Sequence, residues 1–176
     1  MRPIVDVDDT FQVSRSRDEV FDHVARHFFG NHSRWDLAVL RMEPTSPGAI
    51  ALGSTANEVR RYGLWTSSSP VTVDLFEPTT SFGYRSTDGP VLEVVRFMLR
   101  STDSGTSVTL SLKFIANSMI TRLMAPILRR FIARNVRTNL ERIKVAIEGD
   151  GLDSTAGVEP GAARSINGPP RPMPGR

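Results

Sequence analysis

The sequence predicts an α+β protein in which an antiparallel sheet is covered by one long C-terminal helix, and two patterns carry this prediction. From Ala38 to Ala116, short segments of strand character follow one another, separated by turns too short for a parallel crossover. From Asn117 to Gly149, apolar residues recur at helical spacing on one side. An amphipathic helix of that length needs an apolar surface to cover, which the preceding strands can provide.

The composition fits one globular domain. A chain of 176 residues with 39% hydrophobic content can bury a full-sized core. It contains no apolar run near the roughly 20 residues of a spanning helix and no leader with a charged start, so we expect no stable membrane insertion. The absence of cysteine excludes a disulfide framework, a thiolate metal site and a cysteine nucleophile, and a cytoplasmic location is the default expectation.

The N-terminal segment predicts a strand followed by two short helices. Ile4–Val13 has strand character. Ser16 and Glu19 have the spacing of a capping box, which begins a helix. Gly30 can end that helix, and Asn31–Trp35 is expected to form a second helical turn. The apolar side of the first helix comprises Val20, Phe21, Val24 and Phe28.

Six further strands are predicted between short turns rich in Gly, Pro and Asp. They are Ala38–Glu43, Gly53–Arg61, Trp65–Phe76, Ser81–Arg85, Val91–Arg100 and Ser107–Ile115. Alternation is clearest in the last two, which place Val91, Val95, Phe97 and Leu99, and then Val108, Leu110, Leu112 and Phe114, on one face. One polar and one apolar face is what a sheet covered by a helix requires.

The predicted C-terminal helix carries most of the positive charge. Pro126 separates a short lead-in from one long helix. Its apolar stripe comprises Leu128, Ile132, Val136, Leu140, Ile143 and Ile147, and the opposite side comprises Arg130, Arg134, Arg137, Glu141, Lys144 and Glu148. Residues 117–148 hold seven basic and two acidic side chains. This face could contact acidic lipids or nucleic acid, but it lacks aromatic residues for base stacking and has the charge spacing of a solvated helix. We therefore expect no nucleic-acid partner.

The end of the chain has a different composition. Residues 150–176 are dense in Pro and Gly and almost free of large apolar side chains. Such a segment cannot bury enough surface to offset its ordering entropy, which predicts a disordered tail. The expected organisation is a folded domain over residues 1–149, capped by Gly149, and a tail over residues 150–176.

The order of these elements resembles the polyketide cyclase/dehydrase and lipid-transport family of the SRPBCC superfamily, which is related to START and birch-pollen-allergen domains. The likeness covers residues 4–148 and lies in the opening strand followed by SRSRDEVFDHVARHF, in NHSRWD with its Trp35, in PGAIALGST, in DSGTSVTLSLKF and in MAPILRRFIARNVRTNLERIKVAIEG. The resemblance implies a helix-grip fold: a curved antiparallel sheet of about seven strands wrapped around the C-terminal helix, with a hydrophobic cavity between them. The family's motifs are structural and transfer no catalytic residues.

A metal site is the weaker interpretation of the histidines. His23 and His27 lie four residues apart on the first predicted helix, with Glu19 before them and His32 just beyond. The alternative is that they are surface histidines, one near a helix end, and no HExxH pattern is present. No serine lies in a GxSxG turn and no glycine-rich loop matches a phosphate cradle. We therefore expect neither a metal nor a cofactor.

Glu93 is the polar residue of most interest, because the predicted strand places it on the apolar face. A charged, unpaired carboxylate there would cost several kcal/mol, so Glu93 must reach water, a ligand or an arginine, unless the register is shifted by one. Glu93 and Tyr84 are the candidate catalytic residues. The complete set of candidate ligand-binding residues is Trp35, Asn57, Tyr84, Glu93, Val95, Phe97, Leu110, Leu112, Leu128, Ile132, Asn135 and Asn139. The alternative is that the Asn and Tyr side chains satisfy each other or the backbone.

Three functions follow from this interpretation. The favoured one is a carrier or sensor that binds a hydrophobic small molecule or lipid in the cavity. The second is a cyclase- or aromatase-like enzyme, which needs convergent titratable groups, and the sequence offers mainly Glu93 with Tyr84 and Arg85. The third is a protein-interaction module whose cavity is filled by its own side chains. The chain is expected to be a monomer or a homodimer.

Overall fold

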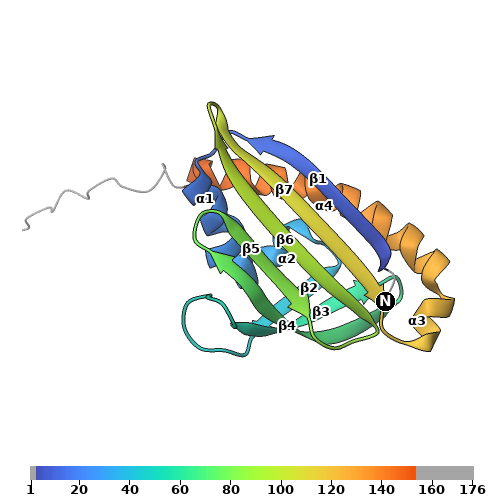
Figure 1. Cartoon of the computed structure of the whole chain (residues 1–176). Coiled ribbons are helices and arrows are strands. Elements are labelled where there is room, and N and C mark those ends of the chain that lie inside the picture. Colours follow the sequence, from blue (N-terminus) through green and yellow to red (C-terminus); the bar gives the residue numbers. More distant parts are fainter. Residues whose placement is uncertain (1–2, 154–176) are drawn as a thin grey trace, which may run out of the picture.

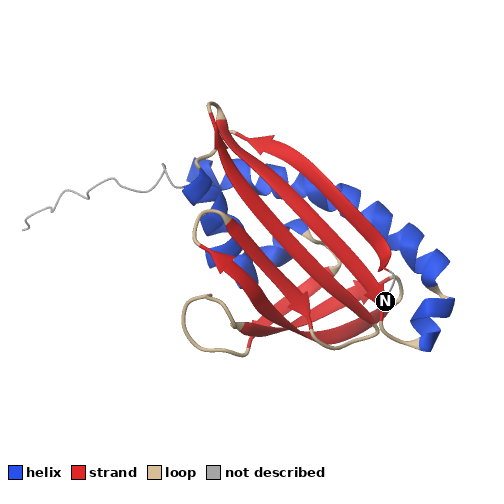
Figure 2. Ribbon diagram, viewed as in Figure 1, coloured by secondary structure: helices blue, strands red, loops and turns tan. Residues whose placement is uncertain are grey.

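The computed structural model of the chain describes residues 3–153. One antiparallel sheet has the strand order β1-β7-β6-β5-β4-β3-β2, and a long C-terminal helix lies against it (Figures 1 and 2). The elements are β1 (Pro3–Val13), α1 (Arg17–Phe21), the π-helical turn η1 (Asp22–Arg26), α2 (Phe28–Trp35), β2 (Val39–Pro44), β3 (Thr55–Tyr62), β4 (Trp65–Glu77), β5 (Ser81–Ser86), β6 (Val91–Thr102), β7 (Gly105–Ala116), α3 (Met119–Leu123) and α4 (Ala125–Asp153). The predicted fold class, with its seven strands, is confirmed.

The helices after β1 begin as predicted but break elsewhere. The backbone N–H of Glu19 donates to Ser16 Oγ at 3.3 Å, and the N–H of Ser16 donates to Glu19 Oε2 at 2.9 Å, which completes the capping box. The prediction that Gly30 ends the helix was wrong. The helical path is interrupted earlier, at His27 (φ −108°, ψ 18°), and Gly30 lies inside α2.

The sheet turns its apolar face toward α4 because polar and apolar side chains alternate along β6 and β7. In the register of this pair, Glu93 lies opposite Phe114, Val95 opposite Leu112 and Phe97 opposite Leu110. Val95, Phe97 and Leu110 are each 2% exposed. These inward residues form the floor of the space beneath α4.

The turn between β6 and β7 depends on one glycine. Gly105 has φ +141°, and a Cβ atom at this position would lie 2.1 Å from the backbone oxygen of Val13. Glycine is required both by the positive φ and by the close approach of the backbone at Val13, at the end of β1. The turn predicted at Asp103–Gly105 is therefore fixed by sterics.

Helix α4 buries the stripe that its sequence predicts. Leu128, Ile132, Val136, Ile143 and Ile147 are 3–5% exposed, and Leu140 packs against them partly buried. α3 forms the predicted lead-in. The predicted cap at Gly149 was wrong, since α4 continues to Asp153. The predicted tail over residues 150–176 otherwise lies outside the described residues.

Candidate functional site

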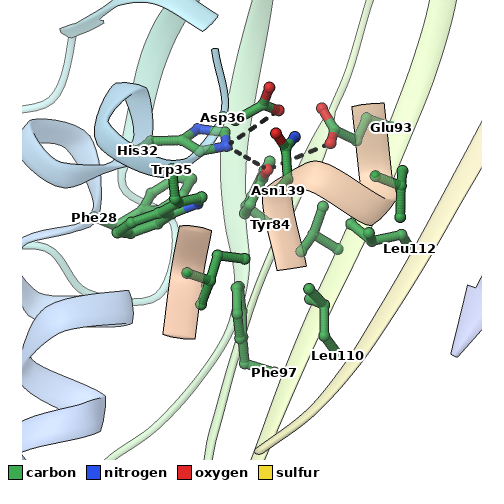
Figure 3. A pocket seen from close by; sticks show the side chains of 13 residues that line it. Phe28, His32, Trp35, Asp36, Tyr84, Glu93, Phe97, Leu110, Leu112 and Asn139 are labelled. Carbon is green, nitrogen blue, oxygen red and sulfur yellow. Dashed lines mark hydrogen bonds and ion pairs between the residues drawn. The ribbon is translucent and has the colours of Figure 1, made fainter. Parts of the chain in front are cut away.

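The candidate site lies between the sheet and α4, with α2 closing one side. In Figure 3 the polar ends of His32, Asp36, Tyr84, Glu93 and Asn139 point toward one another. The rest of the lining is mainly apolar and includes Phe97 and Leu110. The full lining comprises Phe28, His32, Trp35 and Asp36 from the α2 region, Tyr84 from β5, Glu93, Val95 and Phe97 from β6, Leu110 and Leu112 from β7, and Val136, Asn139 and Ile143 from α4. The site is thus an apolar space with polar groups concentrated at one end.

Arg60 on β3 holds three carboxylates at that end. Its Nη1 donates to Asp36 Oδ2 at 2.6 Å, its Nε to Glu58 Oε1 at 2.7 Å, and its Nη2 to Glu93 Oε2 at 2.8 Å. Arg60 and its three partners are each only 4–5% exposed. One buried cation therefore balances three buried acids, and a neutral form of one acid lowers the cost of burying the cluster.

Burial has opposite net outcomes for the pKa values of Glu93 and Asp36. It raises the pKa of Glu93 to about 8, an effect that Arg60 opposes and that Glu58 and Asp36 reinforce. Burial also acts to raise the pKa of Asp36, but Arg60 and His32 outweigh it and the net direction is downward. With this pKa, Glu93 is largely protonated near neutral pH.

His32 and Tyr84 extend the cluster into the apolar part of the site. The Tyr84 hydroxyl lies 3.2 Å from His32 Nε2 and donates to Glu93 Oε1 at 3.5 Å. Burial lowers the pKa of His32 against the opposing effect of Glu58 and Asp36, and burial with the nearby Glu93 raises the pKa of Tyr84 well above its ordinary value. A carboxylic acid, a phenol and a neutral imidazole therefore form one row of groups that can give or take a proton.

The enclosed space is small, and it continues toward solvent. The cavity around Tyr84 has a volume of about 20 Å³, and a neighbouring cavity lined by Ile132 and Asn135 has about 30 Å³. Each has room for only one or two water molecules. An open groove of about 270 Å³ lies between α4 and the turn at Gly63. The two cavities share Glu93 and Val136, and the second cavity shares Arg61 and Asn135 with the groove, so the three spaces lie in series from the surface to Tyr84. Asn139 lines all three.

Most of the predicted site residues lie along this series. The inner cavity is lined by Trp35, Tyr84, Glu93, Val95, Phe97, Leu110, Leu112 and Asn139. Ile132 and Asn135 line the next cavity. Leu128 is buried in the core and lines none of the three spaces.

Besides Leu128, two further predicted residues lie outside the three spaces. Asn57 is exposed, because β3 alternates so that Ala56, Glu58 and Arg60 face inward. Arg85 is also exposed, and its Nε lies 3.6 Å from Asp74 Oδ2, outside the cavity.

The histidines do not form the suggested metal pair. The π-helical turn, in which the N–H of His27 donates to the carbonyl of Asp22 at 3.0 Å, breaks the four-residue repeat. His27 is exposed, whereas His23 and His32 are 6% and 3% exposed, so the expectation of surface histidines was wrong for two of the three. Within residues 3–153, no group of three His, Asp or Glu side chains is arranged to hold a metal ion.

The sequence interpretation missed Arg60, Glu58 and Asp36, and it considered His32 only as a possible metal ligand. A signal was present, since Ala56, Glu58, Arg60 and Tyr62 alternate with outward residues. Two charges on that alternating set have the pattern of a solvated face. They are buried because Glu58 and Arg60 pair with each other and Arg60 also binds Asp36 and Glu93, which lie outside β3.

A sheet curled around a long C-terminal helix, with a partly polar space between them, defines the helix-grip class of proteins. The chain belongs to the polyketide cyclase/dehydrase and lipid transport family, whose profile matches residues 5–148. A comparison with curated proteins gave no match. In the part of the chain that the structure describes, no helix is long and apolar enough to cross a bilayer.

Solved structures share the fold at low sequence identity. The Zhui aromatase/cyclase from a Streptomyces species superposes with a TM-score of 0.70 at 14% identity, covering 88% of this chain and 99% of that one. TTHA0849 from Thermus thermophilus gives 0.67 at 11% identity, covering 86% and 100%. Ara h 8.0201 gives 0.63 at 15% identity, covering 85% and 98%. At these identities the likeness concerns the fold alone.

Proposed function

We propose that the protein binds a hydrophobic small molecule or lipid between the sheet and α4, as a carrier or sensor. The observation that supports this most directly is the series of spaces from the open groove to the buried polar cluster, with Asn139 beside all three. A narrow apolar site with a few polar groups at its end is the usual architecture for orienting a small ligand. The apolar part of the ligand would lie against Phe97 and Leu110, and its polar end would face Tyr84 and Glu93.

The small enclosed volume defines how binding must occur. Cavities of about 20 and 30 Å³ are far below the roughly 300 Å³ of a typical ligand site. A ligand must therefore displace the side chains between groove and cluster, above all Phe131, Asn135 and Val136 of α4. Binding should accordingly shift the packing of α4 against the sheet.

An apolar reporter dye tests this proposal, with emission enhancement as the readout and native mass spectrometry to detect a co-purified molecule. Leu112→Ala should widen the inner space and strengthen dye binding, and Leu110→Trp should fill it and weaken binding. Leu128→Ala is the matched control, because it truncates a buried leucine that lines none of the spaces. If the folded protein takes up neither dye nor lipid, the protein-interaction module becomes the function to pursue.

A cyclase- or aromatase-like enzyme is the second candidate, favoured by the row of Glu93, Tyr84 and His32. Ring closure followed by loss of water requires one group that takes a proton from carbon and one that gives a proton to the departing hydroxyl. A carboxyl group whose pKa is about 8, next to a phenol and an imidazole, suits such an exchange near neutral pH.

Glu93→Gln separates the two candidates. The amide keeps the size and polarity of the carboxyl group but cannot release or take up a proton near neutral pH. A carrier should retain most of its dye affinity. An enzyme that uses Glu93 as its proton carrier should bind a polyketide-like substrate normally and lose turnover.

A further inference from the structure

Exposed apolar side chains surround the open groove. We define the rim as Leu37 before β2, Leu64 and Trp65 at the β3–β4 turn, and Ile127 at the start of α4. Their exposed fractions are 58%, 106%, 40% and 68%. Leu37 lines the groove directly, and Leu64 and Trp65 follow Gly63, which also lines it. Ile127 precedes Phe131 by four residues and Arg134 by seven, so it lies on the groove side of α4.

Helix α3 adds further apolar surface next to the rim. α3 and the first turns of α4 project beyond one end of the sheet (Figure 1). Met119, Ile120 and Leu123 are 88%, 71% and 85% exposed there. Isolated exposed apolar residues are ordinary, but this number on three adjoining segments marks an interaction surface.

The same surface carries unneutralised positive charge. Arg61 and Arg134 line the groove, and neither guanidinium makes an ion pair within residues 3–153. The segment 117–148, which supplies α3 and most of α4, holds seven basic and only two acidic side chains. The partner of this surface must therefore be both negatively charged and able to bury apolar side chains.

Those two requirements select one kind of partner. A second copy of this chain would set guanidinium groups against guanidinium groups. Nucleic acid would neutralise Arg61 and Arg134 but leave Leu64 and Ile127 in water. The interface of an anionic bilayer meets both needs, since apolar tips enter the acyl boundary while arginines contact lipid phosphates.

We propose that the rim, with α3, docks the protein reversibly on anionic phospholipid membranes, so that the groove opens onto the lipid surface. This docking goes beyond ligand binding, because a surface can adsorb to a bilayer whether or not a molecule occupies the cavity. Where the ligand is a lipid, the same contact would supply it.

Vesicle co-sedimentation of the full chain tests the proposal, with Trp65 emission as a second readout. We expect the protein to bind vesicles of phosphatidylcholine mixed with phosphatidylglycerol, and this binding should weaken as salt is added. On vesicles of pure phosphatidylcholine, binding should be near background. Trp35 is buried, so a blue shift on docking would report Trp65 at the rim. Equal binding to neutral and anionic vesicles, or none to either, would overturn the proposal.

Matched substitutions locate the contact. Leu64→Ser should weaken vesicle binding about tenfold, and Arg134→Gln roughly fivefold. The controls are Met98→Ser and Arg100→Gln, which make the same kinds of change on the outer face of β6, where both residues are exposed. Equal losses for rim and control variants would refute docking through the rim.

The outcome for docking is separable from that for ligand binding. Leu112→Ala alters the buried space and should leave vesicle binding unchanged. If dye binding holds and vesicle binding fails, only the docking proposal falls. Self-association of the wild type that is lost in Leu64→Ser would instead assign the rim to a second copy and overturn membrane docking.

Discussion

Replacement of Arg60 by leucine is the sharpest test of the buried cluster. The change keeps an aliphatic side chain but leaves Asp36, Glu58 and Glu93 without the cation that each contacts at 2.6–2.8 Å. Removing one partner of a buried ion pair costs about 3–5 kcal/mol. Three ion pairs are lost together, but proton uptake by the unpaired carboxylates limits the cost. We therefore expect the free energy of unfolding to fall by about 4 kcal/mol near neutral pH.

Urea unfolding followed by tryptophan emission, in which the buried Trp35 becomes exposed, measures this loss, with Arg61→Leu as the control. Arg61 is the next residue of β3 and is exposed, so its replacement should change the free energy of unfolding by less than about 1 kcal/mol. For a chain of this length, 4 kcal/mol corresponds to a fall in Tm of roughly 8–16 °C.

The pH dependence adds a second criterion. Arg60 is the main group that lowers the pKa of Asp36, and burial opposes this effect. The stabilisation that Arg60 gives is therefore present above the pKa of Asp36 in the unfolded chain, and it is lost as the pH falls through the pKa of Asp36 in the folded protein. Without Arg60, Asp36 and Glu93 bind protons more readily in the folded state. The difference between variant and wild type should therefore shrink as the pH is lowered toward about 5. Equal losses of unfolding free energy for Arg60→Leu and Arg61→Leu would refute the proposed role of Arg60 in the cluster. A difference between Arg60→Leu and wild type that does not change with pH would also refute it.

Three further outcomes are expected. Because burial raises the pKa of Glu93 to about 8, the folded state keeps a proton that the unfolded state has already released, and wild-type Tm should fall as pH rises toward about 8. The Tm of Glu93→Gln should fall less over that range, and parallel curves would contradict this. Ile143→Asp should unfold the protein while Arg137→Asp shifts Tm by only a few degrees, since 3% of Ile143 is exposed and Arg137 faces solvent. Gly105→Ala should cost about 2–3 kcal/mol in urea unfolding, and Gly48→Ala, which has a positive φ but open space, about 1 kcal/mol; equal costs would discount the clash at Gly105.

The fold was predictable because its signals are local. Alternation from Val108 to Phe114 and the stripe from Leu128 to Ile147 each specify an element and the face that it buries. Turn residues then restrict the strands to antiparallel pairing. The errors at Gly30 and Gly149 concern where helices end, which depends on packing as well as on residue type.

The site was predictable only in part, because its polar contacts are long-range. Glu93 could be placed inward from its own strand, and the predicted need for a partner was met by Arg60. The identity of that partner could not be predicted, since β3 taken alone has the pattern of a solvated strand. His32 and Tyr84 lie 52 residues apart, and no local periodicity connects them.

The pairing of β1 with β7 has a consequence for biosynthesis. The hydroxyls of Thr10 and Thr109 lie 3.0 Å apart although 99 residues separate them. β1 leaves the ribosome before β7 and can pair with it only after β7 has been translated, and such distant contacts slow folding. During this interval the exposed edge of β1 carries Asp6, Asp8 and Asp9, whose mutual repulsion between chains opposes edge-to-edge aggregation. An acidic β1 should therefore resist edge-to-edge pairing until β7 has been translated.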